Sequence, residues 1–332
     1  MIPLSVLDLS PIVEGGDAGQ SLRASAELAQ AAERLGYSRF WMAEHHSMPG
    51  IASAATAVAL AFVGSQTRSI RIGAGGIMLP NHAPLTIAEQ FGTLESLYPG
   101  RIDLGLGRAP GSDQAAAYAL RRSLGSDANQ FPDDVVELMS YFKGTSGRVR
   151  AVPGEGLSIP IWILGSSLFG AQLAAMLGLP YAFASHFAPQ LMMEAIRVYR
   201  DRFQPSEQLD KPYVMLGFNV FAADTDEQAQ LLATSVQQAF VALRTGHPTQ
   251  LPPPQPGYAE ALPMQARAIL ESVLSCSAIG SPETVRRDVE AFVKRTGADE
   301  LMITSQIYDS AARVRSYELL MDAVRQPELS PA

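Results

Sequence analysis

Cysteine and charged residues are both scarce in this chain of 332 residues. The single cysteine, Cys276, excludes an intrachain disulfide and any metal site built from several cysteines. Charged residues make up 17% of the chain, against roughly 25% in an average soluble protein. Twenty-five basic and 33 acidic residues leave a net charge of −8. This balance argues against a general affinity for nucleic acid or for anionic membranes, since both require clustered positive charge.

Long apolar runs are also missing. The longest, around residues 54–64, is about half as long as a membrane-spanning helix requires. The N-terminal sequence MIPLSVLDLSP lacks the positive charge and the extended apolar stretch of a signal peptide. We therefore expect a soluble, cytoplasmic protein.

What the chain does contain is a regular alternation of β-type and helical runs, with 47% hydrophobic residues to form a core. Strands are predicted at residues 3–9, 39–43, 70–79, 102–106, 160–164, 181–184, 213–222 and 300–305. Helices are predicted at residues 20–35, 52–65, 84–97, 131–142, 168–177, 189–203, 226–244, 281–297 and 311–324.

Eight strands, each followed by a helix, predict parallel strands with crossover helices. Eight such units in a chain of this length favour a single (β/α)8 TIM barrel over residues 1–325, with insertions after strands 4 and 7 and a C-terminal tail at 326–332. An open doubly wound sheet is the alternative. The stretches 107–130, 144–158 and 245–278 exceed what a barrel needs, and the proline-rich residues 251–257 predict an extended or mobile segment.

Four of the five histidines follow predicted strands, where a barrel enzyme builds its active site. Glu44, His45 and His46 follow the second strand, His82 follows the third, and His186 follows the sixth. The clustering indicates an active site, although histidine is also common in ordinary loops. Imidazole titrates near neutral pH and can move protons during turnover. No ligand spacing typical of a metal site is present, so no metal is expected.

Two further features suggest a bound cofactor. The third strand contains Gly73, Gly75 and Gly76, which either let a flat ring approach the backbone or meet a packing requirement of the barrel. Residues 165–167 (Gly-Ser-Ser) lie between the fifth strand and its helix, where backbone amides and hydroxyls can hold a phosphate. An ordinary serine cap is the alternative for that turn. Arg108 would stand on the neighbouring strand exit as a phosphate partner.

Four segments carry a resemblance to a known family. They are Phe40-Trp-Met-Ala-Glu-His-His46, Ile72-Gly-Ala-Gly-Gly-Ile-Met-Leu-Pro-Asn-His82, Pro99-Gly-Arg-Ile-Asp-Leu-Gly-Leu-Gly-Arg-Ala-Pro-Gly111 and Ile279-Gly-Ser-Pro-Glu283. In order and spacing the sequence resembles the bacterial luciferase-like flavin monooxygenases, and most closely a subgroup of uncharacterised substrate. The family has an (β/α)8 barrel, in agreement with the pattern above.

The resemblance implies that FMN, as reduced FMNH2, binds at the C-terminal mouth of the barrel. His45 would be the catalytic histidine beside flavin C4a. The implied cofactor-binding residues are Glu44, then Ala74, Gly75 and Gly76 against the flavin ring in a strand that often has a bulge and a non-proline cis peptide, and Arg108, Gly165, Ser166 and Ser167 around the phosphate. Luciferases use a second phosphate-binding arginine, for which Arg121 and Arg122 are weak candidates here.

The implied reaction is oxygenation of a small organic substrate by reduced flavin and O2 through a C4a-peroxyflavin. A partner flavin reductase would supply FMNH2. A homodimer is expected, formed through the helices after the second and third strands, of which residues 52–65 are unusually apolar. Three alternatives remain: an F420-dependent oxidoreductase that transfers hydride, a non-catalytic flavin-binding protein, and a metal-dependent barrel hydrolase.

Overall fold

Eight parallel strands close into a barrel in the computed structural model, which describes residues 2–108, 116, 119–120 and 128–325. The barrel strands are β1 (Leu4–Asp8), β2 (Arg39–Met42), β3 (Arg71–Met78), β4 (Ile102–Gly107), β5 (Ile161–Gly165), β6 (Tyr181–Phe183), β7 (Val214–Ala222) and β9 (Glu300–Thr304). The pairing of β6 with β7 closes the barrel, and β9 lies between β7 and β1. The predicted TIM barrel is confirmed.

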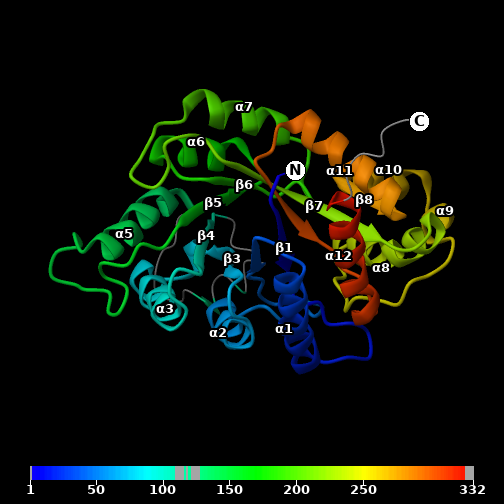
Figure 1. Cartoon of the computed structure of the whole chain (residues 1–332), viewed down its shortest axis with the longest axis horizontal. Coiled ribbons are helices and arrows are strands. Elements are labelled where there is room, and N and C mark those ends of the chain that lie inside the picture. The colour runs from blue at the N-terminus through cyan, green and yellow to red at the C-terminus, as the bar shows by residue number, and fades with distance from the viewer. Residues whose placement is uncertain (1, 109–115, 117–118, 121–127, 326–332) are drawn as a thin grey trace.

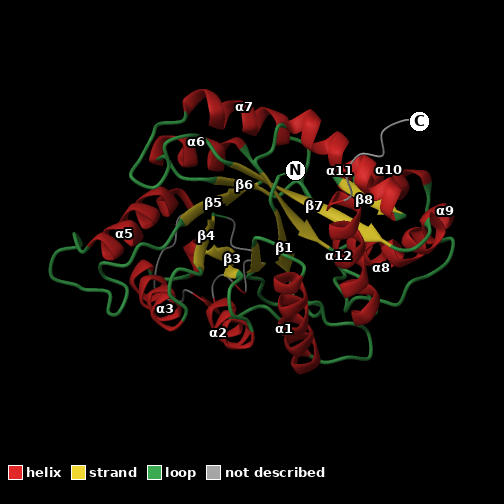
Figure 2. Ribbon diagram, viewed as in Figure 1, coloured by secondary structure: helices red, strands yellow, loops and turns green. Residues whose placement is uncertain are grey.

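Helices surround the barrel and connect successive strands (Figures 1 and 2). They are α1 (Ala18–Arg34), α2 (Thr56–Gln66), α3 (Pro84–Leu97), α5 (Phe131–Lys143), α6 (Leu168–Leu177), α7 (Met192–Arg202), α8 (Asp226–Arg244), α9 (Tyr258–Ala261), α10 (Met264–Val273), α11 (Pro282–Thr296) and α12 (Ser310–Arg325), with 3-10 turns η1 (Leu79–Asn81) and η2 (Ala128–Gln130). None of these described helices has the length and apolar character needed to cross a membrane.

Local sequence explains where several helices begin and end. Asp17 and Gln20 form a capping box at the start of α1, in which each side chain accepts from the other's backbone N–H. Gly144, Gly178 and Gly297 end α5, α6 and α11 in the left-handed conformation, which glycine adopts without steric cost. These signals are local, so the sequence predicts them well.

Two hydrophobic layers follow from the alternation of side chains along each strand. One set of strand residues packs outward against the helices and forms the large core. The other set points into the barrel, and its apolar members are Leu7, Trp41, Ala43, Trp162, Ala182, Met215 and Met302. Trp41 and Trp162 meet edge to face, with ring centroids 5.2 Å apart. The barrel interior is therefore a packed core with no open channel through this layer.

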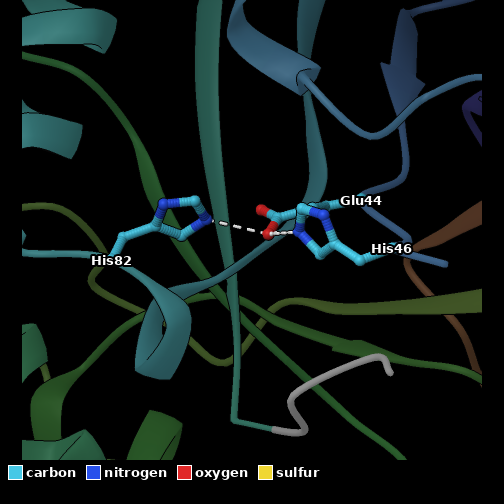
Figure 3. Close-up of side chains that lie close together, drawn as sticks. All are labelled: Glu44, His46 and His82. Carbon is cyan, nitrogen blue, oxygen red and sulfur yellow. Dashed lines mark hydrogen bonds and ion pairs between the residues drawn. The ribbon is translucent and has the colours of Figure 1, made fainter. Parts of the chain in front are cut away.

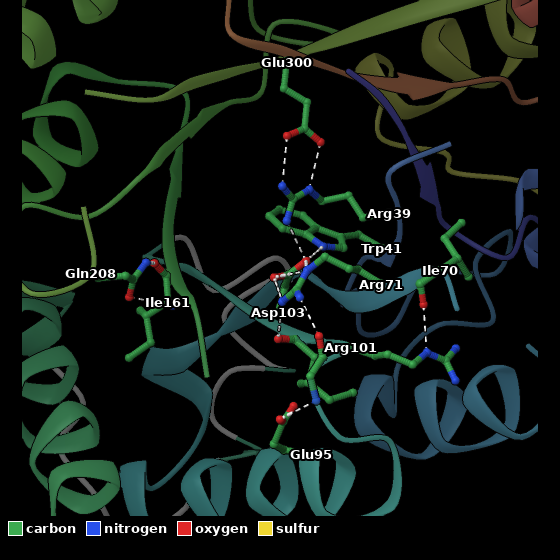
Figure 4. A network of polar contacts seen from close by, with 12 residues as sticks. Arg39, Trp41, Ile70, Arg71, Glu95, Arg101, Asp103, Ile161, Gln208 and Glu300 are labelled. Carbon is green, nitrogen blue, oxygen red and sulfur yellow. Dashed lines mark hydrogen bonds and ion pairs between the residues drawn. The ribbon is translucent and has the colours of Figure 1, made fainter. Parts of the chain in front are cut away.

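A network of charged side chains closes the N-terminal end of the barrel (Figure 4). Arg39 donates to both carboxylate oxygens of Glu300, at 2.8 and 3.1 Å, and to Asp103 at 2.9 Å. Arg71 donates to Asp103 at 2.6 Å, and Tyr213 donates to Glu300 at 2.8 Å. Two arginines thus neutralise two fully buried carboxylates.

A ninth strand, β8 (Ser277–Gly280), lies outside the barrel and was not predicted. It pairs with the last part of β7, from Asn219 to Ala222, beyond the end of β6. The strand has four residues, and its sequence lies inside a stretch that we expected to be an insertion. Short strands give little periodicity, so this one escaped detection.

Other details differ from expectation. Residues 52–55 form turns before α2 instead of its first turn, because the N–H of Ala52 donates to Ser10 and the hydroxyl of Ser53 donates to Leu9. The predicted mobile segment 251–257 begins at a buried Leu251, which pairs with Ile12 and Val13. The insertion after strand 4, with Arg121 and Arg122, and the tail at 326–332 fall largely outside the described residues.

Candidate active site

The C-terminal ends of the strands bring the expected side chains to one mouth of the barrel. His45 continues the alternation of Trp41 and Ala43, which point into the barrel. Its backbone N–H donates to Ser53 at 3.3 Å. The half-buried imidazole has a buried Nδ1 with no hydrogen-bond partner among the described residues. Burial lowers the pKa of His45, against the opposing charge of Glu44, so the ring is neutral at pH 7.

Glu44 is a buried carboxylate that ties the exit of β2 to the end of β3 (Figure 3). Its Oε1 accepts from Nε2 of His46 at 2.6 Å and from Nε2 of His82 at 2.8 Å. Its Oε2 accepts from the backbone N–H of Met78 at 3.0 Å. Burial alone would raise the pKa of Glu44, but these hydrogen bonds and the charge of His82 lower it overall.

Glu44, His46 and His82 are relevant to two expectations from the sequence: that no metal binds, and that Glu44 contacts the cofactor. The ligand atoms of Glu44, His46 and His82 lie within 4.8 Å of one another, which is a spacing that a metal ion can use. Hydrogen bonds already satisfy both carboxylate oxygens, so the expectation of no metal stays a prediction. Glu44 is engaged with protein groups on both oxygens, and its contact with a cofactor also stays a prediction.

The glycine-rich strand β3 has the expected irregularity. Its register to β4 shifts between Ala74 and Ile77, and the Gly75–Gly76 peptide is cis. A Cβ atom at Gly75 would lie 2.7 Å from Leu7, and one at Gly76 would lie 2.7 Å from the backbone oxygen of Gly105. Packing inside the barrel therefore accounts for these two glycines, which was one of the two interpretations. The approach of a flavin ring to this strand stays a prediction.

Arg108 and the start of α6 form a cradle suited to an anion. The register of β4 and β5 pairs Gly107 with Leu164, which places Arg108 beside the turn that precedes α6. The guanidinium of Arg108 lies over the ring of Phe169, 4.3 Å from its centroid. No ion pair joins Arg108 to any of the acidic residues that the structure describes.

Backbone donors complete this cradle. Ser166 is exposed, and Ser167 is the N-cap of α6 but makes no side-chain capping hydrogen bond. The first amide groups of a helix have no intrahelical acceptor and carry partial positive charge. Free amides, two hydroxyls and an arginine without a carboxylate partner match the donor set that a phosphate group requires. The residues present therefore fit the phosphate of a flavin mononucleotide.

Comparison with known sequences identifies the family. A sequence profile of the luciferase-like monooxygenases matches residues 2–300. A luciferase-like monooxygenase of Escherichia coli K12 is 51% identical over 323 residues, which cover 97% of this chain and 96% of that protein. The chain belongs to the luciferase-like monooxygenase family. The resemblance drawn from the four sequence segments is thereby confirmed, as is the expectation of a monooxygenase-type enzyme.

Two further proteins are similar to this chain over nearly its whole length. The N-acetyl-S-alkylcysteine monooxygenase of Bacillus subtilis is 34% identical over 341 residues, covering 98% of each chain. The crystal structure of apo-MsnO8 superposes with a TM-score of 0.87 at 35% identity and covers both chains completely.

More distant structures share only the fold. An FMN complex of the oxygenating constituent of 3,6-diketocamphane monooxygenase from Pseudomonas putida has a TM-score of 0.73 at 20% identity, and each chain is covered to 97%. An F420-dependent secondary alcohol dehydrogenase has a TM-score of 0.72 at 14% identity, covering 98% of this chain and 99% of that one.

Several polar residues of the mouth were not predicted as site residues. His186 was noted only as a histidine after a strand; its Nδ1 is buried without a described partner, as is Oγ1 of Thr304 on β9. Asn219 on β7 donates to the backbone oxygen of His186 at 2.7 Å. Polar residues at inward positions of otherwise apolar strands are the signal that could have found Thr304 and Asn219.

Proposed function

We propose that this luciferase-like monooxygenase uses reduced FMN and O2 to oxygenate a small organic substrate. The observation that carries the proposal is the pairing of two features at one mouth. Arg108 lies beside the first amides of α6 and pairs with none of the described carboxylates, and the neutral imidazole of His45 belongs to the same end of the barrel. The FMN complex of a protein with the same fold supports the choice of cofactor.

Each residue of the site has a part in this proposal. Arg108, Ser166 and Ser167 hold the phosphate through charge and backbone N–H groups. Bound reduced flavin supplies the electrons that activate O2. His45 is neutral at pH 7 and accepts or returns a proton at the reacting centre. The apolar side chains of Trp41 and Trp162 fill the barrel below and keep bulk water from entering through its floor.

Glu44 contributes by positioning. Its hydrogen bonds to His46, His82 and the N–H of Met78 fix the loop that carries His45 against the end of β3. The carboxylate does not need to touch the substrate for this purpose. It determines where the backbone of the neighbouring residue His45 lies.

Anaerobic titration with FMN, FMNH2 and F420, followed by absorbance and fluorescence, tests the cofactor assignment. We expect FMNH2 to bind most tightly. Preferential binding of F420 would contradict the proposal and move the chemistry to hydride transfer. Oxygen uptake with reduced FMN and an N-acetyl-S-alkylcysteine, the class in the name of the Bacillus relative, then begins the substrate screen. Binding of FMNH2 with no oxygenated product from any substrate would favour a non-catalytic flavin-binding protein.

A homodimer and a separate flavin reductase belong to the same proposal. Val58 on α2 and Leu97 on α3 are 72% and 59% exposed, and Phe62 is also exposed, so these two helices present apolar side chains to solvent. This surface supports dimerisation through α2 and α3. Sedimentation equilibrium of the protein and of a Val58→Glu variant tests it, because the charged variant should be monomeric if the surface is the contact. A wild-type monomer at micromolar concentration would exclude the dimer.

A further inference from the structure

His186 occupies a place in the mouth that only glycine at position 217 permits. A Cβ atom at Gly217 would lie 2.1 Å from Nδ1 of His186, well inside contact distance. The neighbouring Phe187 ring stands edge-on to the imidazole, with centroids 4.9 Å apart. The backbone oxygen of His186 accepts from Asn219, whose amide group also donates to Ser277 on β8 at 3.2 Å. Three neighbouring elements therefore fix this ring and its backbone.

The two ring nitrogens of His186 have different surroundings. Nδ1 faces Gly217, is buried, and has no hydrogen-bond partner in the described part of the chain. Nε2 forms no hydrogen bond with a described residue and is not among the buried atoms without a partner, and the residue as a whole is partly exposed. A buried N–H without an acceptor is rarer and more costly than a buried acceptor without a donor. The proton of the neutral ring therefore belongs on Nε2, which faces the open side.

His186 also lies close enough to His45 for their charges to interact. Burial, with a smaller contribution from the charge of His45, lowers the pKa of His186 to about 4. His45 follows β2 and His186 follows β6, which are separated by three strands on either side of the closed barrel. The two imidazoles therefore face each other across the mouth, and both are neutral at pH 7.

We propose that His186 is a substrate-binding residue, which donates a hydrogen bond from Nε2–H to an acceptor oxygen on the organic substrate. The substrate class is then a molecule with a carbonyl or similar acceptor group, held across the mouth from His45. A pure hydrocarbon offers no partner for this N–H, and a cation would meet a donor in place of an acceptor. The inference rests on the proposed function, since it assigns the substrate of the same site.

Nitrogen NMR of protein labelled with 15N-histidine tests the tautomer first. We expect the resonances of His186 to show Nε2 protonated and Nδ1 unprotonated at pH 7. A proton on Nδ1 would overturn the proposal, because the ring would then present no donor to the mouth. This measurement needs no flavin and is independent of whether FMN is the cofactor.

Binding of hexanal and of hexane to the FMN-saturated protein tests the ligand class. Hexanal should shift the Nε2 resonance of His186, and hexane should not. His186→Phe keeps a flat ring but removes the donor, so it should weaken hexanal binding at least tenfold. His186→Gln supplies an amide N–H and should retain part of the affinity. Equal hexanal affinity in wild type and His186→Phe, or no hexanal binding at millimolar concentration, would overturn the assignment.

Two controls separate this inference from the rest of the site. Gly217→Ala should displace the imidazole and reproduce the loss of hexanal affinity with the histidine still present. His247 is exposed on the segment that follows α8, and His247→Phe should leave hexanal affinity unchanged. All of these variants should bind FMN within twofold of wild type. If FMN fails to bind wild-type protein, the proposed function is wrong. If FMN binds normally but wild type and His186→Phe bind hexanal equally, only the role of His186 is wrong.

Discussion

The two ends of the barrel treat buried polar groups in opposite ways. At the N-terminal end, Asp103 and Glu300 are fully buried, and each has an arginine partner and further donors. At the C-terminal end, His45, His186 and Thr304 have buried polar atoms with no described partner. The first arrangement fixes the strands, and the second leaves hydrogen-bonding capacity for a ligand. Trp162, whose ring contacts Arg39 of the closed end, also has a buried Nε1 without a described partner, so unsatisfied groups are more frequent at the mouth but not confined to it.

Electrostatics supports the same contrast. Burial alone would lower the pKa of Arg39, but Asp103 and Glu300 raise it overall, so the charged form is favoured. At the mouth, burial lowers the pKa of both His45 and His186, and the neutral form is favoured. The closed end thus keeps paired charges, whereas the open end combines one partnered carboxylate, Glu44, with the neutral rings of His45 and His186.

The largest effect on stability should come from breaking the network at the closed end. Asp103→Leu leaves Arg39 and Arg71 without their shared partner, which should cost about 3–5 kcal/mol of unfolding free energy. Urea denaturation measures it. Glu290→Ala breaks an exposed pair with Arg286 and should cost about 0.5 kcal/mol or less. Equal losses in the two variants would show that the network is no more important than a surface ion pair.

At the open end, His45→Ala should affect activity far more than stability. The ring makes no side-chain hydrogen bond with any residue that the structure describes, so the unfolding free energy should change little. Loss of a positioned acid–base group should lower coupled product formation about 100-fold to 10,000-fold. Oxygen uptake and product yield measure this, with FMN affinity as the control. Coupled turnover at the wild-type rate would exclude the role of His45.

Arg108→Gln sharpens the comparison by testing a charge that has no carboxylate partner among the described residues. Loss of one charge-assisted contact of about 1.5–3 kcal/mol should weaken FMN binding roughly 10-fold to 100-fold. Riboflavin lacks the phosphate, so its affinity should be the same in both proteins. Anaerobic fluorescence titration gives both constants. A parallel loss of FMN and riboflavin affinity would mean that Arg108 supports the ring or the fold and does not bind the phosphate.

A further prediction is a pH dependence of stability at the mouth. The pKa of His186 is about 4 in the folded protein and near 6.5 when unfolded, so below 6.5 the unfolded state binds more protons. The folded protein should therefore lose stability as the pH falls from 6.5 to 4. Urea denaturation of wild type and His186→Phe across this range isolates the contribution, because the variant lacks it. Parallel curves would show that His186 titrates normally.

The barrel and most of its mouth could be predicted from the sequence because their signals are local. Alternating runs gave the eight barrel strands, and the exits of those strands located His45, His82, Arg108 and the turn before α6. The charged network escaped prediction, since Arg39, Asp103 and Glu300 come from three distant parts of the chain. Their meeting depends on the closed order of strands, which no local window contains.

The roles of several glycines could not be decided from the sequence, and the structure shows the physical reason. Gly75 and Gly76 were equally compatible with ring binding and with packing, and the backbone and side chains around them show that packing alone requires glycine. Gly217 gave no signal at all, because its importance comes from the imidazole of His186, which is 31 positions away. A glycine in the sequence can indicate that a Cβ atom would not fit, but it does not indicate which neighbouring group fills the space.

The position of β8 has a consequence for how such proteins diversify. Because β6, β7 and β9 close the barrel among themselves, the residues between β7 and β8 can lengthen, shorten or be replaced without reopening it. Helices α9 and α10 lie in this segment, at the right of Figure 1, whereas α8 packs on β7 through buried Ala233 and Val236. The far end of the segment returns to Asn219, which contacts His186, so a new segment reaches the wall of the mouth directly. A change of length between α8 and β8 would therefore act on the wall of the mouth without altering the strand pairing that closes the barrel.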